Sequence, residues 1–390
     1  MTPFEERFSA RDLARVARSL RNTLGALVLS IAAGCGKAGT AVVLPDPCDA
    51  PALAVTALRL ANAGPAGRVR EVIDLSGADT GERVGVIADS GLFIGVIASD
   101  AIVLGPRVVS WGRGADRLGG VAAVTVRSTD TVVAVDRGMP RIVRLSIGGT
   151  ARRDVPLRDP AGIDGYAAGG GEVVAITSRR ADRAFEETTG ELFLLDSTGN
   201  RGRRVAQFRS PALHVIGQPS GAKLMTRPFE HQPIVRWSTR WGWMILSTDS
   251  LNLQFADGAA RGVIVGTGRR APIDDTVRET GLSAYVRRTG ATGAIAATIR
   301  KAAEQNLFAG RSSLQLVDEM IPLRDGRVAL RRMRLCRDRQ GWNVLDTLGV
   351  PTAQFTLPLS FVPTMAVRAG LLATTGGTDS LTPVIASFPR

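Results

Sequence analysis

Residues 131–157, TVVAVDRGMPRIVRLSIGGTARRDVPL, alternate between strand-like runs and tight turns. The run from Thr131 to Val135 is apolar and β-branched, and the turn-forming residues Asp136 to Pro140 interrupt it. An alternating run follows, then the double glycine Gly148–Gly149, and then a third strand-like run. This order predicts a meander of short β-strands. Because a meander cannot bury both of its faces alone, we expect further sheets of the same kind to pack against it.

The same outline recurs along the chain, at residues 172–208, 242–265 and 327–357. A glycine follows the second strand of each copy, and these glycines are 50, 59 and 91 residues apart: Gly149, Gly199, Gly258 and Gly349. A repeat of about 50 residues is typical of the larger β-propeller blades. The sequence therefore predicts a repeat architecture instead of two or three unrelated domains.

The longest interval between repeats contains a segment with helical character. Residues 274–307 are rich in alanine and charged residues, and Pro272 and Asp274 resemble a helix start. Glycines such as Gly290 divide the segment. We therefore predict two short helices within about residues 272–310.

Two further units complete the set of blades, and the second, at 363–389, lacks one strand. We expect Val69 to Leu75 to supply that strand, because a borrowed strand closes the ring and removes a free sheet edge. The predicted fold is all-β: a six-bladed β-propeller over residues 68–390, with the two-helix insertion between blades four and five. The predicted blades span about 84–113, 121–157, 163–209, 211–266, 312–357, and 361–390 with 69–75.

Several motifs resemble those of a known family. Residues 131–136 and Arg141 to Val143 look like the blade centre of exported six-bladed propellers of the NHL-like type, which are common as bacterial lipoproteins. Residues 111–114, followed by Gly119 and Gly120, resemble the family's interblade linker but lack its proline and glutamate. The resemblance covers roughly residues 69–390. It implies a fold and an exported location more than an activity.

The N-terminal residues look like an export signal. Five arginines lie within residues 1–21, and an uncharged stretch from Leu24 to Gly34 ends at Cys35. This stretch is too short to span a bilayer, which needs about twenty residues. Ala32 to Cys35 resembles a lipobox, although leucine is commoner at the first position. We predict a signal peptide over residues 1–35 with a lipidated Cys35, and a protein that faces the periplasm or cell exterior. The alternatives are an ordinary secretory signal and a start codon further downstream.

An exported chain invites a disulfide between its remaining cysteines, Cys48 and Cys336. Two unpaired thiols are the alternative. Residues 36–67 are rich in Ala, Pro and Gly, which predicts a tether between the lipid and the ring, together with a partly ordered lead-in to the first blade.

The charge balance gives little support for a nucleic-acid partner. The chain carries 49 basic and 36 acidic residues, a formal charge of +13. Only three of the basic residues are lysines, and the arginines are scattered, as a GC-rich coding bias would produce. We therefore predict no nucleic-acid partner. A contiguous arginine face would instead indicate a polyanion binder, and only the tertiary structure can show one.

One stretch stands out as a candidate ligand contact, the run into the fourth blade. It holds one of only two histidines together with aromatic and cationic side chains: His231, Arg236, Trp237, Arg240 and Trp241. For the tryptophans, packing in the core or between blades is the favoured role. The recurring aspartates Asp136, Asp196, Asp257 and Asp346 fit turns better than a Ca²⁺ site.

No hydrolase elbow, zinc-protease motif or nucleotide-binding loop occurs in the sequence. We predict no catalytic residue, metal or cofactor. The expected protein is a monomer, held at a membrane surface through its N-terminal lipid, that acts as a binding or scaffold module for a protein or small molecule. The alternative is a propeller-type hydrolase or lyase with a metal in its channel.

Overall fold

The structure is a computed structural model that describes residues 41–390, with gaps at 65, 76–81, 115, 149–151, 161, 179–187, 211–213, 219–220, 226–232, 249–250, 257–262, 290, 307, 309–311, 337, 369, 377–380 and 389–390. Ala41–Arg390 forms one compact unit. The predicted signal peptide, Cys35 and His231 lie outside the described residues. Within the described part, no helix is long and apolar enough to cross a membrane.

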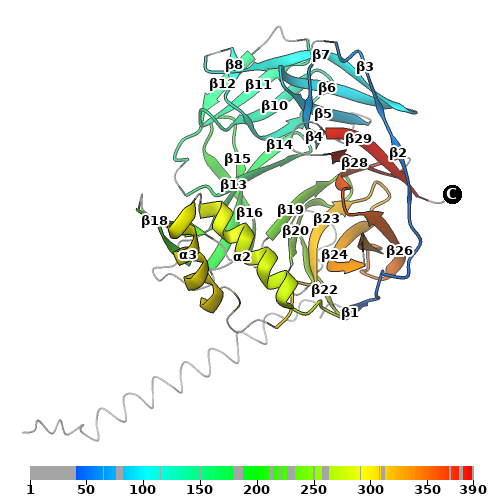
Figure 1. The fold of residues 1–390 in the computed structure, drawn as a ribbon. Helices are drawn as coiled ribbons and strands as arrows, with labels where there is room; N and C mark the ends of the chain where they lie inside the picture. Colours follow the sequence, from blue (N-terminus) through cyan, green and yellow to red (C-terminus); the bar gives the residue numbers. More distant parts are fainter. Residues whose placement is uncertain are drawn as a thin grey trace, which may run out of the picture. The chain divides into compact units, whose positions relative to one another are not determined.

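The described strands form a six-bladed β-propeller (Figure 1), as the sequence predicts. From the inner to the outer strand, the first three blades are β4 (Val69–Asp74), β5 (Arg83–Ala88), β6 (Gly91–Ala98), β7 (Ala101–Trp111); β9 (Val121–Val126), β10 (Thr131–Asp136), β11 (Arg141–Ser146), β12 (Arg152–Pro156); and β13 (Gly165–Gly169), β14 (Glu172–Ser178), β15 (Thr188–Leu195), β16 (Arg201–Ser210). The other three are β19 (Pro233–Ser238), β20 (Gly242–Ser247), β21 (Asn252–Phe255), β22 (Val263–Gly268); β23 (Val317–Pro322), β24 (Val328–Cys336), β25 (Arg339–Leu345), β26 (Pro351–Pro358); and β27 (Val362–Val367), β28 (Gly370–Gly376), β29 (Leu381–Ser387).

Three smaller features lie outside this pattern. The short strand β8 (Arg117–Leu118) pairs with β7 in parallel. The strands β17 (His214–Gln218) and β18 (Gly221–Met225) form a separate hairpin, so blade 4 begins at β19 and not near residue 211 as expected. The predicted helical insertion is present as α2 (Asp275–Thr289) and α3 (Gly293–Asn306), between blades 4 and 5. Asp274 caps α2, because its carboxylate accepts a hydrogen bond from Val277 N at 2.9 Å.

Three of the four recurring aspartates serve turns between strands, as the sequence predicts. Asp136 is fully buried, and its Oδ1 accepts hydrogen bonds from Gly138 N at 2.9 Å and from Gly119 N at 3.0 Å. The first bond forms an Asx turn, and the second fixes the linker that leads into blade 2. Asp196 and Asp346 make the same bond to the backbone two residues on. Asp257 lies outside the described residues.

Hydrophobic packing between neighbouring blades holds the ring together. Six clusters of buried side chains each join one pair of adjacent blades, and a seventh lies under the helices. Trp243 and Trp342 are fully buried in two of these clusters, which confirms the packing role expected for tryptophans. Each blade therefore buries both faces against its neighbours, and closing the ring leaves no blade with an unpacked face.

Residues 41–61 differ from the expected tether, because they form three strands along the outer edges of the ring. β1 (Ala41–Leu44) pairs in parallel with β22 of blade 4, β2 (Ala54–Ala57) is the outer strand of blade 6, and β3 (Arg59–Ala61) pairs in parallel with β7 of blade 1. We call this segment the outer strap; Figure 1 shows it in blue.

The strap also corrects the predicted ring closure. The strand borrowed by the last blade is β2, and Val69–Asp74 is instead the inner strand of blade 1, paired with β5. A hairpin from β4 directly into β5 is the shorter connection, so it outcompetes the distant partner. The closing strand is short and lacks a long alternating pattern, which is why the sequence did not reveal it.

Candidate functional site

The central channel of the propeller is the strongest candidate site, because residues from all six inner strands converge on it. A cavity of about 620 Å³ lies there, within the size range of small-molecule sites. Its lining comes from β4, β9, β13, β19, β23 and β27. The pairing register shifts within β4, β23 and β27, as at a β-bulge. Such a shift changes the direction in which the side chains near the channel point.

The cationic group of the channel lining is already neutralised. Arg236 on β19 lies 2.7 Å from Glu319 on β23, a bond that joins the inner strands of blades 4 and 5. The Arg236 side chain is 42% exposed and that of Glu319 is 21% exposed. Such a half-exposed ion pair adds little to stability, but it neutralises one positive charge in the channel.

Glu71 on β4 presents a second carboxylate to the channel. The side chain is accessible, yet neighbouring protein atoms displace water around it, and this burial raises its pKa above the ordinary glutamate value. The positive charge of Arg137 acts in the opposite direction and lowers the pKa. Among the described residues, no side chain donates a hydrogen bond to this carboxylate.

Other polar groups complete the lining. Burial raises the pKa of the Tyr166 phenol, with Arg201 opposing the rise, so the phenol is neutral at pH 7. Asp74 on β4 and Thr364 on β27 also reach the cavity, and the rest of the lining is mostly apolar. In the described part of the chain, the channel thus holds more carboxylates than cations, although the whole protein is basic.

The predicted ligand-contact stretch divides into two groups. Arg236 and Trp237 lie on β19 and line the channel. Arg240 and Trp241 lie at the following turn, where Trp241 Nε1 donates to Gly326 O at 2.8 Å and Arg240 donates to Asp325 O at 3.4 Å. The Arg240 guanidinium stacks 5.2 Å from the Trp241 ring centroid. The second group therefore binds blade 4 to blade 5 instead of facing the channel.

Trp237 also explains the glycines at the turn between β13 and β14, Gly169 to Gly171. A Cβ atom on Gly169 would lie 2.3 Å from Trp237 Cβ, and one on Gly170 would lie 2.5 Å from the indole ring. Gly170 in addition has a φ of 61°. Only glycine fits at these positions, because Trp237 of blade 4 packs directly against the turn between β13 and β14 of blade 3. Trp237 is thus both a channel-lining and an interblade residue.

Sequence reasoning missed Glu71, Tyr166 and Glu319. Each occupies an inner strand, and their separation along the chain leaves no local motif. The sequence did indicate that the recurring aspartates serve turns and not a Ca²⁺ site.

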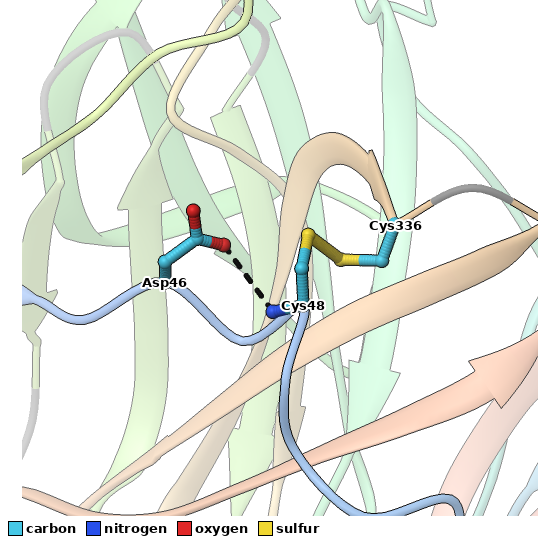
Figure 2. A group of neighbouring side chains, drawn as sticks. All are labelled: Asp46, Cys48 and Cys336. Atoms are coloured by element: carbon cyan, nitrogen blue, oxygen red, sulfur yellow. Dashed lines mark hydrogen bonds between the residues drawn. A yellow bond between two sulfur atoms is a disulfide. The ribbon is translucent and has the colours of Figure 1, made fainter.

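In the described part of the chain, one group has the residue types and spacing to hold a metal ion: Asp46, Cys48 and Cys336. Figure 2 shows that its two sulfurs are joined in a disulfide, so they are not available as ligands. The Asp46 carboxylate instead accepts a hydrogen bond from Cys48 N at 3.2 Å. A further hollow of about 620 Å³ lies between α2 and α3, but it involves two helices only.

No protein-family model matches the chain, and no curated protein is similar to it in sequence. Among solved structures, an oligogalacturonate lyase from Vibrio parahaemolyticus is similar at 10% identity and a TM-score of 0.42, covering 88% of this chain and 93% of the lyase. YCF48 bound to a D1 peptide is similar at 10% identity and a TM-score of 0.37, covering 90% and 98%. The β-propeller domain of Cps50 (Swd1) from Myceliophteria thermophila is similar at 12% identity and a TM-score of 0.36, covering 86% and 100%. Likeness at this level carries no argument about function.

Proposed function

We propose that this protein is an exported, lipid-anchored propeller that binds a ligand in its central channel. The supporting observation is the cavity of about 620 Å³ into which all six blades direct residues. Apolar walls with a few polar groups are typical of small-molecule sites. The export and the anchor rest on the arginine-rich N-terminus and the lipobox-like Cys35. The ligand is a small molecule or an extended side chain of a partner protein.

The charges in the channel favour a cationic ligand. Arg236 is paired with Glu319, while the Glu71 carboxylate receives no hydrogen bond from a described side chain. An ammonium or guanidinium group would supply the missing donor to Glu71, and its alkyl or aromatic part would contact the apolar walls. Tyr166 adds an aromatic ring suited to a cation.

This proposal predicts that amines bind and that the Glu71→Gln variant binds them about tenfold more weakly, because one charge-assisted hydrogen bond is lost. The measurement is calorimetric titration at neutral pH with cadaverine and tyramine, and with N-acetyltyramine as the uncharged probe. Glu304→Gln is the matched control, since Glu304 lies on α3, away from the channel. Equal affinities for Glu71→Gln and the wild-type chain would contradict the channel site.

The pH dependence provides a second readout of the same site. Burial raises the pKa of Glu71, so protonation of this carboxyl begins at a higher pH than for an exposed glutamate near pH 4.3. The protonated form cannot pair with an ammonium group. Amine affinity should therefore fall as the pH is lowered towards the raised pKa, and Glu71→Gln should abolish this dependence.

The anchor is tested separately by cell fractionation. Replacing Cys35 with alanine removes the thiol that would carry the lipid, so the protein should move from the membrane fraction to the soluble fraction. Ser30→Ala provides the matched control, because Ser30 lies in the same uncharged stretch but carries no thiol, so its replacement should leave the membrane fraction unchanged. An unaltered membrane fraction in Cys35→Ala would exclude a lipid at this position.

The alternative function is a hydrolase or lyase that uses a metal in the channel. The channel carboxylates of the described residues do not gather into a group with metal-ligand spacing. Metal analysis of the purified protein, with thermal unfolding before and after chelator, would decide between the two. A stoichiometric metal whose removal lowers the melting temperature would favour the enzyme.

A further inference from the structure

Strand pairing in blade 2 brings two arginines side by side on one face of the sheet. Arg144 on β11 pairs directly with Arg153 on β12, and on its other side with Val133 on β10. Val133 in turn pairs with Thr125 on β9. Side chains of directly paired residues point to the same face of an antiparallel sheet, so these four positions form one row across the blade.

A third arginine, Arg127, joins this face from the end of β9. Its amide donates to Thr131 O at 2.9 Å, so the pairing of β9 with β10 continues to this residue. Because side chains alternate along a strand, Arg127 points to the same face as Thr125. The turn between β13 and β14 packs against both: Gly171 N donates to Thr125 Oγ1 at 3.2 Å, and a Cβ atom on Gly171 would lie 3.3 Å from Arg127 Cγ. We call the three residues the arginine cluster: Arg127, Arg144 and Arg153.

In the described part of the chain, no side chain neutralises the arginine cluster. Arg127 and Arg153 are exposed, and their guanidinium groups form no hydrogen bond or ion pair. Arg144 is half-buried, and its Nε is buried without a hydrogen-bond partner. A buried donor without a partner costs free energy, which a bound acceptor would recover.

The carboxylates close to these arginines in the sequence are engaged elsewhere. Asp130, in the turn after β9, accepts hydrogen bonds from two neighbouring hydroxyls. Asp154 follows Arg153 directly but points to the opposite face, where it pairs with Arg141 at 2.7 Å. The arginine cluster therefore presents uncompensated positive charge.

The charges of the cluster also repel one another. Partial burial lowers the pKa of Arg144, and the positive charges of Arg127 and Arg153 lower it further. The guanidinium still stays protonated at neutral pH, because arginine loses its proton only in strong base. Like charges directly opposite each other in a sheet are destabilising. An anion bound among the three side chains would offset this repulsion and give Arg144 Nε an acceptor.

We propose that the arginine cluster binds a phosphate group, either as free phosphate or as part of a phosphate ester. The oxygens of one phosphate group accept hydrogen bonds from several guanidinium groups at once, and a phosphate monoester carries a charge of about −1.5 to −2 at pH 7. A carboxylate carries one negative charge and two oxygens, so it matches three guanidinium groups less well. The site is separate from the channel, because none of the three arginines lines that cavity.

The test is calorimetric titration of the purified full-length chain at neutral pH with inorganic phosphate, glycerol 2-phosphate and acetate. Phosphate should bind roughly tenfold more tightly than acetate. Arg144→Gln and Arg153→Gln should each weaken phosphate binding roughly tenfold, because each removes a charge-assisted hydrogen bond. Arg287→Gln is the matched control, since Arg287 is an exposed arginine on α2, between blades 4 and 5.

Thermal unfolding provides a second readout. Phosphate should raise the melting temperature of the wild-type chain and of Arg287→Gln, but not that of a variant combining Arg144→Gln and Arg153→Gln. Without phosphate, Arg153→Gln should be at least as stable as the wild-type chain, because one repulsive charge is removed. This result would separate a lost binding site from a damaged fold.

The two phosphate probes distinguish the sources of the phosphate group. Binding of both probes, or of inorganic phosphate alone, would support a site for free phosphate. Binding of glycerol 2-phosphate alone would support a site for a phosphorylated molecule. Equal phosphate affinities in the cluster variants and the Arg287 control would overturn the proposal, as would equal affinities for acetate and phosphate. None of these outcomes bears on amine binding in the channel.

Discussion

Replacing Arg332 with methionine is expected to lower the free energy of unfolding by about 3–5 kcal/mol, the range for breaking a buried charged network. Arg332 on β24 is 3% exposed. Its guanidinium donates to Pro45 O at 3.0 Å, to Leu44 O at 3.4 Å and to Arg269 O at 2.6 Å. It also donates to Leu316 O and Asn343 Oδ1. One side chain thus joins the strap, blade 4 and blade 5.

The cost arises from the acceptors that remain. Methionine fills a similar volume but donates no hydrogen bond, so buried carbonyl groups such as Leu44 O lose their partner. Denaturant unfolding followed by tryptophan fluorescence measures the change. Arg327→Met is the matched control, because Arg327 pairs with Asp325 at the surface and its loss should cost about 1 kcal/mol or less. Similar losses in the two variants would show that Arg332 does not hold the strap.

Removing the Cys48–Cys336 disulfide should lower the free energy of unfolding by about 3–5 kcal/mol. The bond joins residues 288 apart in sequence, with Cα atoms 4.8 Å apart. Opening so long a loop gives the unfolded chain more freedom, which is the main effect in the chain-entropy model. The bond also attaches the strap to blade 5, beside the bridge between Ala52 and Thr356.

The measurement compares denaturant unfolding of the wild-type chain, with and without reductant, with that of a Cys48→Ser, Cys336→Ala double variant. Reductant should destabilise the first and leave the second unchanged. Hydrogen exchange of β1 should increase most when the bond is absent, because this four-residue strand then depends on one parallel ladder. A uniform increase over all blades would contradict a local role for the strap.

Local patterns in the sequence determined the architecture of the ring. The period-two alternation around Thr131–Asp136 reflects the pleat of a β-strand. The Asx turn at Asp136 involves only the next two residues along the chain. Neither pattern depends on a distant partner. For the same reason Asp274 marked the start of α2. The sequence also paired Cys48 with Cys336, and the structure bonds them. That inference needed only the count of cysteines and the expectation that the chain is exported.

The tertiary structure alone decided the strap and the channel. β1 and β3 pair in parallel with strands that do not follow them directly in the sequence, so no hairpin turn marks these pairings. β2 pairs with β29 only when the ring closes. The channel combines Glu71, Arg236 and Glu319 from three blades, whose positions depend on how the blades stack. Stacking is governed by side-chain packing between sheets, a long-range property that a local pattern does not encode.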